Sequence, residues 1–485
     1  MAEALEGTYG GSVDGALLSL EALSAAYPGD PMGPYLEALV FSWKIESQPE
    51  SVLLDQECVR RADAAIALAQ ARLAKDSQDA RALLAMGAAH GVKSRLALLR
   101  GDHGKAASEA VAMRSALLKA RAADPDSKDV LFGLGLYDYF VDVLPRLAKV
   151  LRFLTGMPGG NRARGLASIE EARKSAVFHR SEALAQLSQI HAVYERAPDA
   201  ALGELRELRI RYPGSPLWGL RLAALEGESL GLYKEAERVN EEIMNASQRH
   251  EANYAPIVGL MARVQWGEAL LLDLRLPEAR RVLAPALDGD PDAPWIGPRA
   301  EYAFGRSLEL SGDRDGALEH YRTARLASKG EERRRSESAL GNPLTTAEVR
   351  GQARIAAARR LREAGRRAES RQAFLDALRL WPDSQEALLR AAEGDMEEGR
   401  LAAARGPLEK LAALPETRPP FVKPWSHLLL ARILDADGER IRALREYKEV
   451  YEHPCGETWL RNRAFEGLDR PYAPSEGGAT PSPQQ

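Results

Sequence analysis

The chain has 485 residues, of which 80 are alanine and only 6% are aromatic. Because alanine favours helices while aromatic and β-branched residues favour strands, this composition predicts one long helical array rather than several β-containing domains. The 66 basic and 70 acidic residues nearly cancel, so no overall field attracts nucleic acid or an anionic membrane. Cys58 and Cys455 are too far apart for a zinc or CxxC motif, and no apolar run is long enough to span a membrane.

The first 136 residues contain incomplete copies of a helix-hairpin pattern. Alanines and leucines three or four positions apart, often followed by proline, mark second helices at Ala16 to Pro28, Ala64 to Ala71 and Leu117 to Pro125. Before Ala16 there is room for only about two turns of helix. We therefore predict that residues 1–136 form degenerate hairpins and that the first hairpin has a short first helix.

Residues 137–165 interrupt the pattern with an apolar and basic segment that ends in a glycine cluster. Proline suits the first turn of a helix, so Pro145 predicts the start of a short amphipathic helix. We name five of its residues as a candidate membrane- or partner-docking face: Arg146, Lys149, Val150, Arg152 and Phe153. The alternative is an extra helix packed on the array with its basic side chains in solvent. No GK[ST] follows the glycines, which predict a turn and not a phosphate loop.

The clearest repeats lie in residues 166–327 and 347–470. One spacing recurs. A small residue in the first helix is followed by leucine three positions later and by a second small residue twelve positions later. A large residue follows four positions after that, and a small or apolar residue three positions further on. This spacing is met by Gly267, Leu270, Ala279, Leu283 and Ala286, by Gly305, Leu308, Ala317, Tyr321 and Ala324, and by Ala431, Leu434, Ala443, Tyr447 and Val450. The small residues would let two helices approach closely, and the large residue would fill the space beside them.

Between these two blocks, residues 328–346 replace periodic apolar residues with charged and small polar ones, which predicts a charged loop. Residues 329–371 carry twelve basic and six acidic residues but no aromatic residue, so a nucleic-acid partner is not predicted. The helix expected near residues 457–468 would cap the array, and residues 471–485 are expected to be a disordered tail.

The repeats resemble the tetratricopeptide repeat (TPR) family from about Gly15 to Leu468. The resemblance implies an all-α, right-handed superhelical solenoid of about nine to ten helix hairpins. Residues 131–172 also resemble the inclusion-body-clearance family of TPR proteins, some of which are linked to the outer mitochondrial membrane or lipid handling, and its bacterial relatives. Leu144, Pro145, Gly159, Gly160, Arg162, Gly165 and Leu166 carry this second resemblance. It brings no catalytic residues.

In the TPR pattern, groove residues lie six and three positions before the small first-helix residue and one and four positions after it. Projection onto this chain gives nine candidate partner-binding residues: Arg299, Tyr302, Arg306, Glu309, Arg359, Arg362, Trp425, Leu428 and Arg432. Arginine forks pair with carboxylates, which predicts an acidic or carboxylate-ended peptide. The alternative is that these arginines pair with glutamate and aspartate on adjacent helices.

No HExxH, GxSxG or GxGxxG signature is present, and the eight histidines show no paired spacing. We therefore predict no enzymatic activity, no cofactor and no metal site. The predicted function is a protein-interaction scaffold or adaptor that holds a peptide or partner subunit in a concave groove. The alternative is a membrane-peripheral or lipid-handling protein that uses residues 137–165. The predicted location is cytoplasmic as the chain is written, and periplasmic if an N-terminal signal has been removed.

Overall fold

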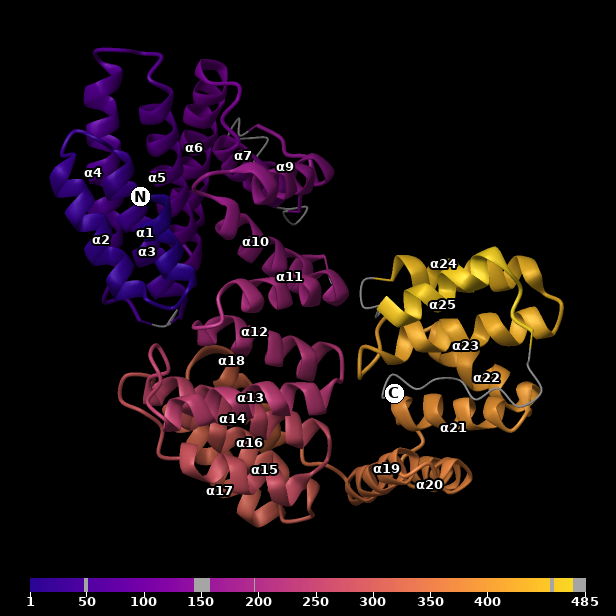
Figure 1. Ribbon diagram of the computed structural model, residues 1–485. Coiled ribbons are helices and arrows are strands. Elements are labelled where there is room, and N and C mark those ends of the chain that lie inside the picture. Colours follow the sequence, from indigo (N-terminus) through magenta and orange to yellow (C-terminus); the bar gives the residue numbers. More distant parts are fainter. Residues whose placement is uncertain (48–50, 144–157, 196, 454–457, 474–485) are drawn as a thin grey trace. The chain divides into compact units, whose positions relative to one another are not determined.

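The computed structural model describes residues 1–47, 51–143, 158–195, 197–453 and 458–473 (Figure 1). Over these ranges the chain forms helices and contains no β-strand. The helices belong to two compact units, of which unit 1 comprises residues 1–189 and 206–215 and unit 2 comprises residues 190–205 and 216–485. The predicted all-α class is confirmed.

In unit 1 the helices are α1 (Ala2–Tyr9), α2 (Val13–Ala26), α3 (Met32–Ser47), α4 (Asp55–Leu73), α5 (Ala80–Leu99), α6 (His103–Ala123), α7 (Asp129–Val143), α9 (Arg162–Ser175) and α10 (Arg180–Gln189). Helix α11 (Pro198–Arg211) contributes residues to both units. Consecutive helices pack as hairpins, α1 on α2, α3 on α4, α5 on α6 and α7 on α9.

In unit 2 the remaining segments are η1 (Ile190–Tyr194), α12 (Pro216–Ala224), η2 (Leu225–Ser229), α13 (Tyr233–Gln248), α14 (Pro256–Leu272), α15 (Leu276–Leu283), η3 (Ala284–Ala286), α16 (Ile296–Leu310), α17 (Arg314–Ala327), α18 (Gly330–Gly341), α19 (Thr346–Glu363), α20 (Arg367–Leu380), α21 (Gln385–Glu397), α22 (Leu401–Ala412), α23 (Val422–Ala436), α24 (Arg440–Glu452) and α25 (Thr458–Asp469). The hairpins are α12 with α13, α14 with α15, α16 with α17, α19 with α20, α21 with α22, and α23 with α24. Helix α25 packs on α24 and α23, the position expected of a capping helix.

The repeat positions predicted from spacing are the contacts that close each hairpin. A Cβ added to Gly267 on α14 would lie 2.4 Å from Cγ of Leu283 on α15, and one added to Gly305 on α16 would lie 3.0 Å from the ring of Tyr321 on α17. Leu283 and Tyr321 are fully buried. The small residue therefore sets the distance between the two helices, and the large residue opposite fills the remaining space.

Glycine also provides the turn between the helices of several hairpins. Gly312 (φ +88°) follows α16 and Gly438 (φ +78°) follows α23. Both take the left-handed backbone conformation that glycine adopts without steric cost and that commonly ends a helix.

The charged segment expected as a loop over residues 328–346 contains α18. Its charges follow the helical period, and Arg333 Nε lies 3.0 Å from Glu337 one turn away. Ala339, from the same helix, is buried in a cluster with Tyr321 of α17. The count of charged residues suggested a loop, but their spacing allows a helix with one buried edge.

The predicted insertion begins within a helix, since α7 continues past Tyr137 to Val143, and α9 starts at Arg162. The candidate docking residues Arg146, Lys149, Val150, Arg152 and Phe153 lie outside the described residues, as do residues 474–485 of the expected tail.

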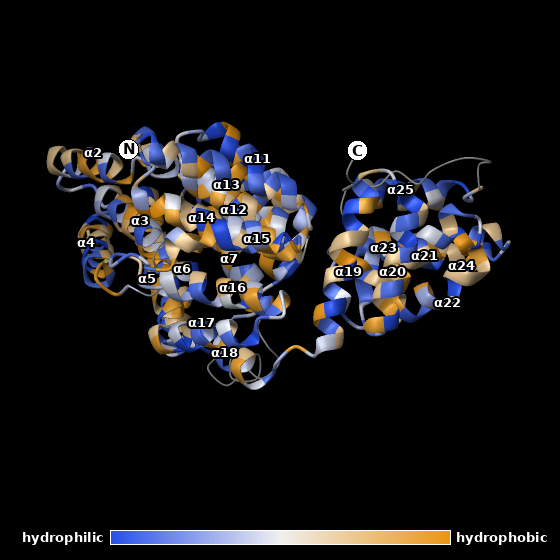
Figure 2. Cartoon of the chain, turned by 90° about the horizontal axis from the view of Figure 1, so that it is seen from below, coloured by the Kyte–Doolittle hydropathy of each residue, from blue (hydrophilic) through white to orange (hydrophobic). Residues whose placement is uncertain are grey.

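The helices carry both hydrophobic and hydrophilic residues (Figure 2). No helix in the described ranges is both long enough and apolar enough to cross a membrane.

We expect the same substitution to have opposite effects at two helical glycines. Gly267→Ala places a methyl group against Leu283 and should lower stability by about 1–3 kcal/mol through overpacking. Gly203 in α11 is exposed with no atom near its Cβ position, so Gly203→Ala should raise stability by about 0.5–1 kcal/mol. Urea unfolding followed by circular dichroism measures both effects. Equal shifts would contradict the close-approach role of Gly267.

Candidate functional site

Unit 2 contains a cavity of about 60 Å³ that we call the α19 cavity. Residues 230–232 ahead of α13, Tyr233 at its start and Asp273 at the end of α14 form part of its wall, and side chains from α19 to α23 form the rest. Cofactor and drug-sized ligands fill pockets of roughly 300–1,000 Å³. The α19 cavity is large enough for one small chemical group with a few waters.

Arg359 of α19 forms the centre of the cavity wall. Its Nε and Nη2 donate to the two carboxylate oxygens of Glu386 at 2.8 and 2.7 Å, and its Nη1 donates to the carbonyl oxygen of Leu272 at 2.9 Å. That carbonyl belongs to the last turn of α14, where helical partners run out. Burial disfavours the charge of Arg359, but Glu386 raises its pKa above the usual value, and Arg359 in turn lowers the pKa of the buried Glu386.

A second group of ion pairs lies beside the first. Arg362 Nη2 lies 2.9 Å from Glu393 and 3.1 Å from Glu397, and Arg390 Nη1 donates to Glu393 at 2.9 Å. The guanidinium of Arg390 also lies 4.1 Å from the centre of the Trp425 ring, a cation–π distance. The buried Nε of Arg362 donates no hydrogen bond within the described part of the chain.

Of the three acidic groups that line the cavity, Asp273 has the most distant basic partner. Its side chain is 14% exposed, and its nearest basic atom is Arg359 Nη1 at 3.6 Å. Its carboxylate accepts no hydrogen bond from any described residue. Burial raises the pKa of Asp273 to about 6, against the opposing effect of Arg359.

Four of the nine predicted groove residues lie on α16 and do not line the cavity. Arg299 donates to both carboxylate oxygens of Glu268 at 2.7 Å, and Arg306 donates to the nearly buried Glu309 at 2.8 Å. The Tyr302 ring packs beside that of Tyr321. Arg299, Arg359 and Arg362 pair with acids on other helices, as in the alternative interpretation, whereas Arg306 pairs within its own helix.

The three predicted residues on α23 have different environments. Trp425 and Leu428 are 1% and 0% exposed and belong to the hydrophobic core around α23, where the cavity reaches Trp425. Arg432 is 8% exposed, and its guanidinium lies 5.1 Å from the centre of the Tyr472 ring. Of the nine predicted residues, the cavity brings together Arg359, Arg362 and Trp425. Residues that the sequence did not single out, Tyr233, Asp273, Glu386 and Arg390, complete it.

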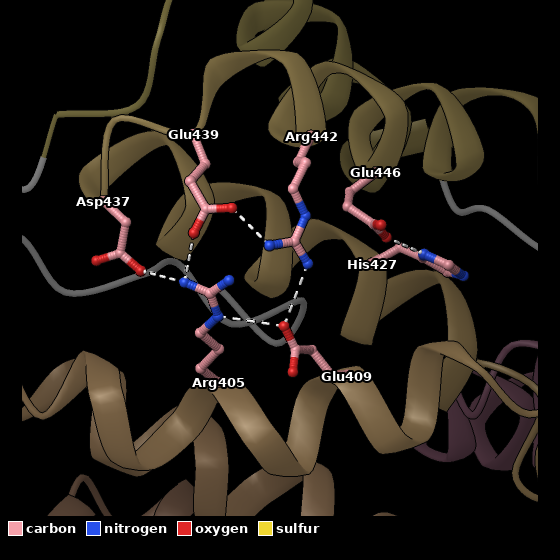
Figure 3. Close-up of polar contacts among 7 residues, drawn as sticks. All are labelled: Arg405, Glu409, His427, Asp437, Glu439, Arg442 and Glu446. Atoms are coloured by element: carbon pink, nitrogen blue, oxygen red, sulfur yellow. Dashed lines mark hydrogen bonds and ion pairs between the residues drawn. The ribbon is translucent and has the colours of Figure 1, made fainter.

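A separate polar cluster joins the last two hairpins (Figure 3). Arg405 on α22 donates to Glu409 at 3.1 Å, to Asp437 at 2.8 Å and to Glu439 at 2.7 Å, and Arg442 reaches Glu409 and Glu439 from α24. These side chains are 26–49% exposed, and ion pairs that solvent reaches contribute little to stability. The cluster satisfies charges between neighbouring hairpins.

Unit 1 contains a buried chain of polar groups that the sequence analysis missed. His179 Nδ1 lies 3.0 Å from Asp129 Oδ1, and His179 Nε2 lies 2.5 Å from the Tyr35 hydroxyl. Asp129 also accepts backbone N–H groups, including that of Phe178 at 2.8 Å. All three residues are at most 5% exposed, so a substrate does not reach them. The order of the groups, carboxylate to imidazole to hydroxyl, is that of a catalytic triad. Because the three residues are buried, we assign them a structural role.

Neighbouring Glu182 is fully buried and accepts three hydrogen bonds, from Tyr9 Oη at 2.8 Å, Trp43 Nε1 at 2.6 Å and Arg95 Nη1 at 2.9 Å. A buried carboxylate is costly unless hydrogen bonds and an opposite charge compensate for its lost hydration. Across the described residues, no group of three histidine, cysteine or acidic side chains is arranged to hold a metal ion.

Comparison with known proteins finds similar solved structures but no family. No family model matches the chain, and no curated protein matches it. Among solved structures, the P58(IPK) TPR domain shares 14% identity over 90% of this chain and 96% of its own, with a TM-score of 0.24. Yeast Tom70 shares 12% identity over 88% of this chain and 97% of its own, with a TM-score of 0.32. Cut9, from a complex with Hcn1, shares 14% identity over 94% and 86%, with a TM-score of 0.27.

By its own helices and their packing, the chain is an all-α helical-hairpin repeat protein with a small polar cavity. Its structural neighbours include TPR proteins, but identities and TM-scores this low carry no information about function. The resemblance of residues 131–172 to the inclusion-body-clearance family is not confirmed.

Removing the charge of Arg359 should be costly because it leaves Glu386 buried without a counter-charge. We expect Arg359→Leu to lower stability by about 3–5 kcal/mol. The double variant Arg359→Leu, Glu386→Leu should recover much of that loss, since Glu386 is then no longer a buried charge without its partner. Urea unfolding of the wild type and both variants measures this coupling. Equal losses in the single and double variants would contradict it.

The Asp129 carboxylate should make unit 1 sensitive to acid. Burial opposes its charge, but hydrogen bonds from His179 and the backbone lower the pKa of Asp129 to about 2. Because the folded state favours the carboxylate, its contribution, on the order of 2 kcal/mol, is present above about pH 4 and is lost as the pH falls through about 2. Unfolding temperatures measured against pH should therefore fall more steeply in this range for the wild type than for Asp129→Asn. Parallel curves would be the contrary result.

Proposed function

We propose that this protein is a non-enzymatic scaffold whose unit 2 holds a peptide or a partner subunit at the α19 cavity. One observation supports the proposal. Two predicted groove residues, Arg359 and Arg362, line the same cavity as residues 230–233 and Asp273, which come from an earlier part of the array. Surfaces that combine segments of several repeats are the usual binding surfaces of helical-repeat proteins.

The chemistry of the cavity favours recognition over catalysis. None of the described residues that line it is a serine, cysteine or histidine. Its arginines are held by carboxylates at fixed distances, and Phe374, Phe421 and Trp425 supply rigid apolar walls. Rigid aromatic walls and preorganised polar groups lower the entropic cost of binding a partner side chain.

The charge of the predicted groove arginines does not select an acidic partner. Arg299, Arg306, Arg359 and Arg362 each lie within 3.1 Å of a glutamate oxygen. An acidic peptide would have to displace these glutamates. The proposed partner is therefore defined by its position on the array rather than by acidity.

The membrane-peripheral alternative depends on the amphipathic segment after Pro145, which lies outside the described residues. No observation in the described ranges favours that alternative, and the scaffold function is the conclusion.

Site-specific crosslinking tests the position of the partner. A photoreactive benzoylphenylalanine at Glu363, on the exposed rim of the cavity, should crosslink the partner in the native host. The matched control places the same residue at Arg379, whose side chain is 72% exposed on α20 and does not line the cavity. Crosslinked products are identified by mass spectrometry.

The expected result is one product that forms at Glu363 and is absent at Arg379. The same products at both positions, or none at Glu363 while the partner is retained by affinity purification, would contradict binding at the α19 cavity.

A further inference from the structure

The charged groups around the α19 cavity can be assigned to three sets of mutual partners. Two sets are balanced, namely Lys234 with Glu363, and Arg362 and Arg390 with Glu393 and Glu397. The third set contains one guanidinium, Arg359, between two carboxylates, Glu386 and Asp273. Once Asp273 is ionised, the third set has a net charge of −1, and Asp273 holds the unbalanced charge because Glu386 takes both parallel hydrogen bonds of Arg359.

The other charged groups that face Asp273 do not neutralise it. Glu363 on α19 repels it, and Lys234 on α13 is paired with that same glutamate. Arg275, two residues further along the chain, is 2.6 Å from Glu237 and also holds Glu278. The carboxylate is therefore surrounded by basic groups whose charges are already matched.

We propose that the α19 cavity binds a single ammonium group of a partner, a lysine side chain or an amino terminus, with Asp273 as its counter-charge. The size of the cavity suits one such head group. Tyr233 and Phe421 line the same space. Their rings already face the guanidinium groups of Arg359 and Arg390 at 5.6 and 5.7 Å, so they offer the aliphatic stem of the ligand an apolar wall. The proposal rests on the proposed function only in assigning the ammonium to a protein partner.

The unpaired Nε of Arg362 makes an anion the competing ligand for this cavity. An anion at that atom would approach Glu393 and Glu397, which already lie 2.9 and 3.1 Å from Nη2 of the same guanidinium. Two carboxylates beside one donor repel a third negative group. The charge arrangement therefore favours the cation.

Isothermal titration calorimetry of the full chain with three small probes tests the proposal without a partner. The probes are N-acetyl-lysine methylamide, its side-chain-acetylated form and N-acetyl-glutamate methylamide. We expect the lysine probe to bind about tenfold or more tightly than either of the others, because only it brings an ammonium to Asp273. Its affinity should fall as the pH drops below about 6, where Asp273 takes up a proton.

Asp273→Asn should weaken binding of the lysine probe about tenfold or more, since it removes the counter-charge but keeps the shape. The matched control, Asp288→Asn, makes the same change at an exposed residue that does not line the cavity and should leave the affinity unchanged. Circular dichroism melting verifies that both variants are folded.

Three results would overturn the proposal: equal affinity for the lysine and acetyl-lysine probes, unchanged affinity of Asp273→Asn, or no binding of the lysine probe. Tighter binding of the glutamate probe would assign the cavity to an anion at Arg362. In each case, retained crosslinking at Glu363 would leave the scaffold function standing, whereas loss of crosslinking with intact lysine-probe binding would contradict the scaffold function alone.

Discussion

The close approach of two helices at a small residue is the constraint on which the array depends. A side chain at Gly267 or Gly305 would collide with Leu283 or Tyr321, so these positions fix how deeply each hairpin closes. A hairpin closed in this way buries the contact between its own helices but leaves its other faces to its neighbours. Stacking of successive hairpins then brings charged residues of their first helices into partial burial.

Two of the ion pairs between hairpins follow from this stacking and share one register. Glu268 lies one position after the small residue Gly267, and its partner Arg299 lies six positions before Gly305. The pair of Arg359 and Glu386 occupies the same two positions on α19 and α21, with the charges exchanged. Positions expected to face a free partner therefore pair with each other between successive first helices, because partly buried charges need a counter-charge.

The sequence predicts well what repeats locally and poorly what depends on distant contacts. Spacing predicts the packing in residues 261–450 because each hairpin contact lies within about 20 residues. The repeat spacing also places Glu268 and Arg299 at groove positions of adjacent repeats. Alignment of these repeats would have indicated that the two residues pair. The composition of residues 328–346 predicted a loop. That prediction is wrong for α18, because its charged residues follow the helical period. The contact of Tyr35 with His179 joins residues 144 apart, and no pattern in a single sequence indicates it.

The exceptional position of Asp273 follows from the same register. It caps the C-terminal end of α14, outside the first-helix positions that exchange partners, so the regular pairing leaves it without a dedicated arginine. The negative end of the α14 dipole adds to its unfavourable environment. Arg359 lies near Asp273 but donates its hydrogen bonds to Glu386 and to the Leu272 carbonyl. A positive group from outside is the one addition that stabilises this carboxylate without breaking a pair that holds two hairpins together.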